Sequence, residues 1–99
     1  MLLDKELNNN IRSKIINLIK KHPLAPNIHD LRTRDIGGSY IFELHLELDG
    51  NMSLYEAHTY TEEVENILHK EFPTAQIIIH QDPKDIEEKR LDNELIKDN

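Results

Sequence analysis

The sequence predicts a small α+β domain in which two helices cover one face of a three-stranded sheet. Two segments repeat apolar residues at spacings of three and four, which is typical of helices, and three shorter segments have the character of strands. Their order along the chain is helix, strand, strand, helix, strand, and 99 residues suffice for one core of this kind. No further predicted element is left to cover the second face of the sheet, so we expect a two-fold dimer.

The first predicted helix follows three consecutive asparagines at residues 8–10, and asparagine is a favourable N-cap. The helix covers about 12 residues. Lys20 and Lys21 lie in its last turn, where cations complement the helix dipole, and Pro23 ends it. Its apolar series consists of Ile11, Ile15, Leu18 and Ile19, and His22 continues the spacing.

Two strands joined by Gly37-Gly38 form a predicted hairpin. The first strand, Ile28 to Arg34, alternates weakly, and a regular strand would place His29, Leu31 and Thr33 on one face. The second strand, Ser39 to Leu48, alternates clearly, so one of its faces is apolar and packs on the helices. Its other face is mostly polar and consists of Ile41, Glu43, His45 and Glu47.

The second predicted helix begins after Ser53, with Glu56 at the capping-box position, and runs for about 18 residues to Pro73. The last strand is Ala75 to Gln81, rich in isoleucine and ended by Pro83. Residues 84–99 mix charges of both signs with scattered apolar residues, which is compatible with a helix or with a frayed tail.

Charge and composition narrow the class of function. Residues 24–83 hold eleven acidic residues and three lysines or arginines, a formal charge of −8, which disfavours a nucleic acid partner and favours cations. A solvated acidic surface that keeps the chain soluble would also explain this charge. The sequence has no cysteine and no apolar run of the roughly 20 residues that a membrane-spanning helix needs. We therefore expect a soluble chain without disulfides or thiolate metal ligands.

The six histidines point to a metal site. His80 and Asp82 are two residues apart in the last strand, so both side chains point to one face, and imidazole with carboxylate suits zinc or a late first-row metal. His29 and His45 on neighbouring strands can reach the same ion, and Asp82 can bridge two ions. His58, early in the second helix, can complete a second site from its own chain or from a partner. His22 and His69 stand beside lysines at helix ends that we expect to be exposed.

Each of these residues also has an ordinary structural explanation. A single histidine in a strand is more often a hydrogen-bonded surface or core residue than a metal ligand. A metal held by three ligands, such as His29, His45 and Asp82, with a fourth position open could catalyse hydrolysis of a substrate. However, two short loops leave little room for a substrate pocket. No nucleophile motif or phosphate loop is present, so we do not expect an enzyme.

Four separate motifs are HDLRTR (His29 to Arg34), FELHLEL (Phe42 to Leu48), EAH (Glu56 to His58) and EFPTAQIIIHQDP (Glu71 to Pro83). In their order and spacing, they resemble the C-terminal cytoplasmic domain of cation diffusion facilitators, and the bacterial ferrous-iron and zinc efflux branch most of all. The resemblance covers roughly residues 10–83.

The resemblance implies an αββαβ fold of the metallochaperone-like, ferredoxin-like type that forms a homodimer. Residues 1–10 would be the linker from a missing membrane domain, residues 11–83 the metal-binding dimerisation domain, and residues 84–99 a charged C-terminal tail. The parent protein would be an antiporter that exports divalent cations in exchange for protons, and this domain would lie on the cytoplasmic side of the bacterial inner membrane.

The resemblance also implies a regulatory site of two ions per protomer at the dimer interface, with zinc as the first expectation and Fe²⁺, Cd²⁺, Co²⁺ and Ni²⁺ as further candidates. Its ligands would be His29, His45, His80 and Asp82, with His58 reaching across from the partner chain. Two alternatives remain open. The chain could be a constitutive dimerisation module with weak or no metal binding, or a free-standing metallochaperone.

Overall fold

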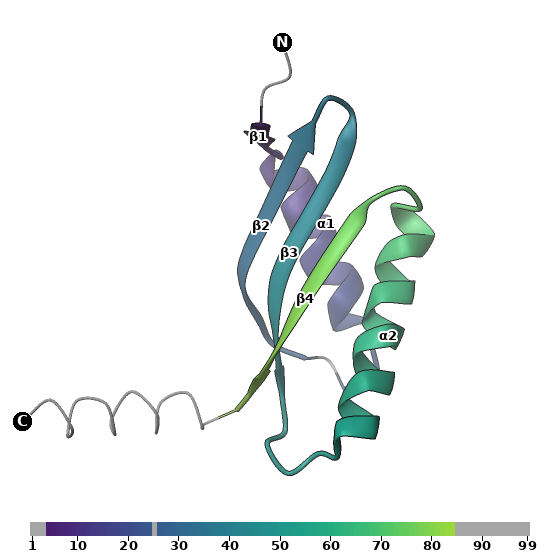
Figure 1. Ribbon diagram of the computed structural model, residues 1–99. Coiled ribbons are helices and arrows are strands. Elements are labelled where there is room, and N and C mark those ends of the chain that lie inside the picture. Colours follow the sequence, from purple (N-terminus) through teal and green to yellow (C-terminus); the bar gives the residue numbers. More distant parts are fainter. Residues whose placement is uncertain (1–3, 25, 85–99) are drawn as a thin grey trace, which may run out of the picture.

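The computed structural model describes residues 4–24 and 26–84, with side chains from residue 7 onward (Figure 1). The predicted order of helix, strand, strand, helix, strand is confirmed, and a short additional strand precedes it. The elements are β1 (Asp4–Glu6), α1 (Asn9–Lys20), β2 (Ile28–Ile36), β3 (Ser39–Leu48), α2 (Leu54–Glu71) and β4 (Gln76–Pro83). The tail expected at 84–99 lies outside the described residues except for Lys84.

One sheet contains every strand of the described residues, in the order β1-β2-β3-β4. We expected three strands, and these are β2, β3 and β4. The fourth, β1, comes from the segment that we assigned to a linker, and it pairs antiparallel with the end of β2. The β2–β3 pair is an antiparallel hairpin, whereas β3 and β4 run parallel because α2 crosses over between them.

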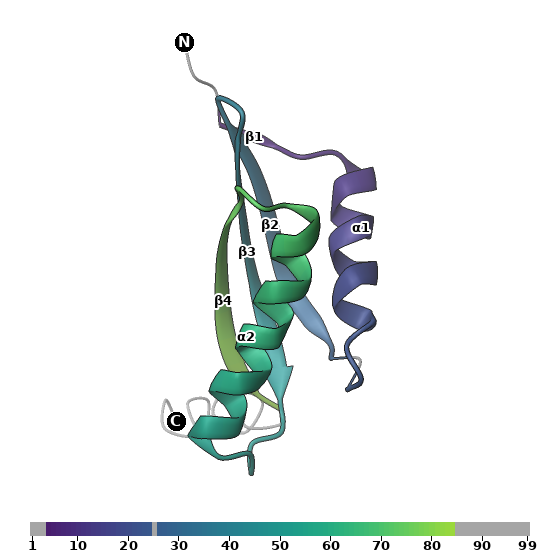
Figure 2. The ribbon, with the colours of Figure 1, turned by 90° about the vertical axis from the view of Figure 1, so that its right-hand side faces the viewer.

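Both helices lie on the same side of the sheet, which is seen edge-on in Figure 2. Over residues 4–24 and 26–84, no element covers the opposite side, which we call the open face. The site described below lies on this open face.

Local sequence chemistry fixes where the elements begin. The Asn8 side chain caps α1 by accepting the Ile11 N–H at 3.1 Å. Ser53 Oγ accepts the Glu56 N–H at 3.0 Å and Glu56 Oε1 accepts the Ser53 N–H at 3.4 Å, so the predicted capping box of α2 is confirmed. The β2–β3 turn uses Gly37 and Gly38 at φ of 62° and 93°, values that glycine adopts without steric cost.

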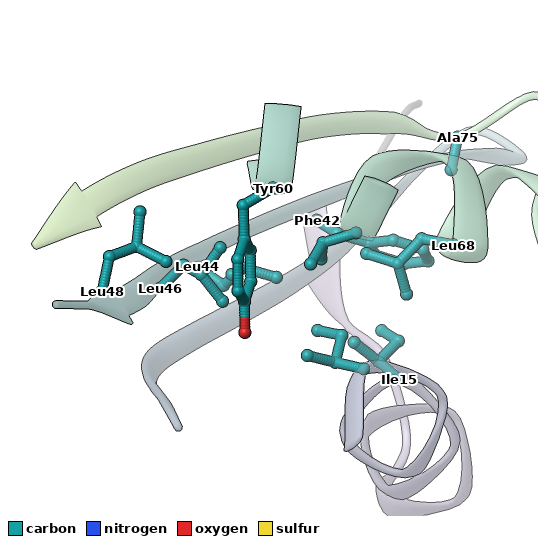
Figure 3. Packing of buried hydrophobic residues seen from close by; sticks show 10 residues of the cluster. Ile15, Phe42, Leu44, Leu46, Leu48, Tyr60, Leu68 and Ala75 are labelled. Atoms are coloured by element: carbon teal, nitrogen blue, oxygen red, sulfur yellow. The ribbon is translucent and has the colours of Figure 1, made fainter. Parts of the chain in front are cut away.

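The core lies between the helices and the covered face of the sheet (Figure 3). Residues of β3 are alternately buried and half-buried, so its apolar side chains pack on the helices while the intervening ones stay on the open face. The buried hydrophobic residues are Ile15, Ile19, Phe42, Leu44, Leu46, Leu48, Tyr60, Val64, Leu68 and Ala75. This packing makes β3 a rigid support for the polar side chains on its other face.

His22 corrects one expectation, because its side chain is buried instead of exposed at a helix end. It is only 6% exposed, and its ring stacks on Tyr60 with 4.4 Å between centroids. Its Nδ1 accepts the Leu24 N–H at 3.2 Å. The other histidine of this pair, His69, is half-buried, and its Nε2 lies 3.1 Å from the carbonyl oxygen of Ala75. Both histidines therefore serve the packing of the helix ends.

Candidate metal centre

Three strands bring four of the five candidate ligands to one end of the open face. His29 is the second residue of β2 and stands directly opposite His45 of β3. In the parallel pair, His45 stands opposite His80, and Glu47 stands opposite Asp82. The start of β2 and the ends of β3 and β4 meet at the lower end of the sheet in Figure 1. Residues from three distant parts of the sequence thus become neighbours.

A β-bulge in β2 decides which way His29 faces. Between the His29–His45 and Arg32–Glu43 pairs, β2 has two residues where β3 has one. Asp30, in the bulge, has φ of 52°, in the left-handed region that Asp tolerates better than most residues. The expected regular alternation is therefore wrong: Thr33 is buried on the helix side, whereas His29 shares the open face with His45.

Asp82 is the centre of the cluster. Its Oδ2 lies 3.0 Å from His29 Nε2 and 2.9 Å from His45 Nδ1. One ligand atom from each of the three residues lies within 4.8 Å of the others. The ligand atoms around a tetrahedral zinc ion, bound at about 2.0–2.1 Å, are about 3.3 Å apart. These three half-buried side chains fit a divalent ion in both chemistry and spacing.

His80 lies beside this cluster without joining it. Its ring stacks on that of His45 at 4.6 Å between centroids, and the His45 ring stacks in turn on His29 at 5.2 Å. The Nε2 atom of His80 is 2.7 Å from Glu43 Oε2. The hydrogen bond with His80, together with the charges of His80, Arg32 and His45, lowers the pKa of Glu43.

His58 stands apart from the other candidates. It belongs to α2, on the helix side of the sheet, and its side chain is 69% exposed. Its Nε2 lies 2.8 Å from Glu62 Oε1, one helical turn away. Of the five predicted ligands, the chain brings together His29, His45 and Asp82, places His80 alongside, and leaves His58 separate.

Two residues that we did not single out as candidates belong to this region. Glu43 contacts His80, and Glu47 Oε1 lies 3.7 Å from His29 Nδ1. Both alternate with His45 on β3, and this alternation was visible in the sequence.

None of the helices in the described part of the chain combines the length and apolar character that a bilayer crossing requires.

Comparison with known proteins points to one family. Residues 7–84 match the family model described as the cytoplasmic domain of cation efflux proteins. The chain is 47% identical over 87 residues to protein p34 of Rickettsia rickettsii, and 44% identical over 86 residues to the cation-efflux pump FieF of Shewanella oneidensis. These alignments cover 88% and 87% of the chain but only 29% of each relative. The chain therefore spans less than a third of the length of these relatives.

Solved structures share the fold. The zinc form of CzrB has a TM-score of 0.68 and 31% sequence identity, covering 83% of this chain and 94% of that one. The metal-bound C-terminal domain of the CzcD transporter from Thermotoga maritima has a TM-score of 0.69 and 26% identity, covering 78% and 94%.

Proposed function

The chain belongs to the family of cytoplasmic domains of cation efflux proteins, and from this membership we propose that it is the metal-sensing, dimer-forming domain of a divalent-cation exporter. The whole protein would exchange cations for protons across the bacterial inner membrane, with this domain on the cytoplasmic side. Residues 1–10 would link it to the membrane domain, residues 11–83 would form the regulatory unit, and residues 84–99 would form the charged tail.

The observation that carries the proposal is the convergence of His29, His45 and Asp82 on the open face. Neutral imidazoles and a carboxylate would hold zinc, or Fe²⁺, Cd²⁺, Co²⁺ or Ni²⁺. With two ions per protomer, His80 and the partner's His58 would supply further ligands. A bound ion would supply positive charge and coordination bonds between two protomers.

Dimer closure would follow from the charge on each protomer. Residues 24–83 carry a formal charge of −8, so two such bodies repel each other when their open faces approach. The protomers would close when bound cations offset this repulsion, provided that the closed dimer binds metal more tightly than the open one. In the full protein, this closure would bias the membrane helices toward export.

Zinc titration by calorimetry tests the assignment of ligands. We expect the wild-type chain to bind zinc. The double variant His80→Ala with Asp82→Ala should bind fewer zinc ions per chain, and bind them more weakly. His69→Gln is the control, because it removes an imidazole outside the cluster and keeps a donor for the Ala75 carbonyl. Unchanged zinc binding in the double variant would refute the site.

X-ray scattering of the same samples tests the coupling to the dimer. We expect a more compact dimer with zinc than without it. Identical profiles would instead indicate a constitutive dimerisation module, even if the zinc titration succeeds. A single-protomer mass under both conditions would contradict the dimer itself.

A further inference from the structure

Glu43 is an acidic residue outside the three-ligand cluster that contacts the candidate ligand His80. It lies on the open face of β3, two residues before His45, and reaches diagonally to His80 on β4. Its contact with His80, 2.7 Å between Oε2 and Nε2, is shorter than the 2.9 and 3.0 Å contacts that Asp82 makes with His45 and His29. His80 therefore has a specific partner in the metal-free chain, and that partner is not a member of the cluster.

The charges around Glu43 keep it available as an acceptor. The 2.7 Å contact with His80 engages one oxygen of Glu43, and Arg32 stands opposite Glu43 in the β2–β3 register, where a positive charge favours the carboxylate form. A carboxylate can only accept a hydrogen bond, so the His80 nitrogen that faces it must be the one that carries the proton. A protonated ring nitrogen has no lone pair for a metal ion.

We propose that Glu43 sets the order of metal binding by holding His80 away from the cluster until the first ion is in place. This inference rests on the proposed function, and it concerns the second of the two ions. His29, His45 and Asp82 need only lose the protons between them to form the first site, because their ligand atoms already lie within 4.8 Å of one another and the carboxylate that faces both imidazoles is itself a ligand. His80 joins only when its Nε2 exchanges Glu43 for an ion and gives up its proton.

The competing geometry makes the opposite prediction. If His80 bound metal through Nδ1, the Nε2–Glu43 hydrogen bond would persist, and Glu43 would act as an outer carboxylate that strengthens the ligand. Loss of the Glu43 carboxylate would then weaken the second ion. In the arrangement that we propose, the same loss strengthens the second ion relative to the first.

Stepwise zinc titration of the full chain distinguishes these arrangements. The variants are Glu43→Gln, Glu43→Ala and the matched control Glu47→Gln. Glu47 carries the same charge on the same face, two residues beyond His45, but it lies near His29 and not His80. Since the Glu43–His80 pair is exposed, we expect both Glu43 variants to raise the second binding constant relative to the first by about two- to fivefold. Glu47→Gln should not raise the second binding constant.

Nitrogen-15 NMR of the imidazole rings reports which ring nitrogen carries a proton, and this readout does not depend on the overall charge of the chain. In the metal-free wild type, His80 should show a protonated Nε2. During the titration, the signals of His29 and His45 should change with the first equivalent of zinc, and those of His80 only with the second. In the Glu43→Ala variant, the protonated Nε2 signature of His80 should weaken before any zinc is added.

Each contrary result has a definite meaning. If His80 responds to the first equivalent, or if the Glu43 variants lower the second constant, the proposed order is wrong while the metal site stands. If Glu43→Gln and Glu47→Gln change both constants alike, only charge is involved and the proposal falls. If the wild type binds no zinc, the proposed function fails together with this inference.

Discussion

The bulge at Asp30 gives the sharpest test of how the backbone positions the site. Asp30 is exposed and has φ of 52°, so its substitution changes backbone strain without opening the core. Left-handed backbone costs an ordinary L-residue about 1–2 kcal/mol, and Asn and Asp are among the residues that tolerate it. We expect Asp30→Val to lower the free energy of unfolding by about 1–2 kcal/mol relative to Asp30→Asn, which removes the charge but tolerates the conformation.

Two further variants define the baseline of this series. Asp30→Gly should stay within about 0.5 kcal/mol of the wild type, because relief of the left-handed strain is offset by the greater freedom of glycine in the unfolded chain. Gln76→Val is the matched control, since it places valine at an exposed strand position that has ordinary backbone geometry. It should be neutral within about 0.5 kcal/mol.

The assay is denaturant unfolding of the metal-free chain in chelator, at one protein concentration because self-association makes apparent stability depend on concentration. For a domain of this size, about 1 kcal/mol also shifts the melting temperature by roughly 4–8 °C. Zinc titration of the same variants should show weaker binding for Asp30→Val than for Asp30→Asn, since closing the bulge would turn His29 toward the helices. Equal stability and equal zinc affinity of these two variants would refute the role of the bulge.

Two other predictions concern the support beneath the site and an ion pair between the helices. Leu44→Ala removes a fully buried side chain from β3 and should cost about 2–5 kcal/mol in denaturant unfolding, whereas Leu54→Ala, at a leucine that is 82% exposed, should cost less than about 0.5 kcal/mol. Comparable losses in the two variants would contradict the packing. The hydrogen bond from Lys14 lowers the pKa of Glu71 from its reference of 4.5, so this pair stabilises the fold above pH 4.5 and its contribution is lost as pH falls through the folded-state value. The stability difference between wild type and Glu71→Gln should therefore be largest near neutral pH and vanish in acid, and a difference that persists in strong acid would exclude this ion pair as its source.

Local signals in the sequence sufficed for the main elements. Ser53 with Glu56 and Pro73 bounded the long helix, and strict alternation located Ser39 to Leu48, because caps and period-two patterns act over a few neighbouring residues. The strand β1 was missed because its three polar residues become a strand only by pairing with β2. A short edge strand of this kind carries no period of its own.

The candidate site was predictable by residue type more than by geometry. His29, His45 and Asp82 were assigned to one cluster, and the structure brings them together. The bulge that turns His29 onto the open face was not predicted, because a bulge residue has no clear signature in the sequence of a strand. Every side chain beyond the bulge points to the face opposite to the one that regular alternation predicts. Asp30 itself was the one local hint, as a residue type that tolerates positive φ.

His22 shows a different limit. Its neighbours Lys20 and Lys21 suggested an exposed helix end, yet the imidazole continued the apolar spacing of the helix and packs on Tyr60. Likewise, the pairing of His80 with Glu43 depends on the parallel register of β3 and β4, which residue patterns within either strand do not specify.

The parallel pairing of β3 with β4 also determines when the site can form during synthesis of the chain. His45 and Asp82 are 37 positions apart, and all of α2 must emerge between them before they can meet. Contacts this distant along the chain form late, because the intervening loop must be closed first. A nascent chain that has reached only Glu71 already displays His29 and His45, but it lacks the carboxylate that unites them. The three residues can thus meet only in a polypeptide whose β4 has docked against β3.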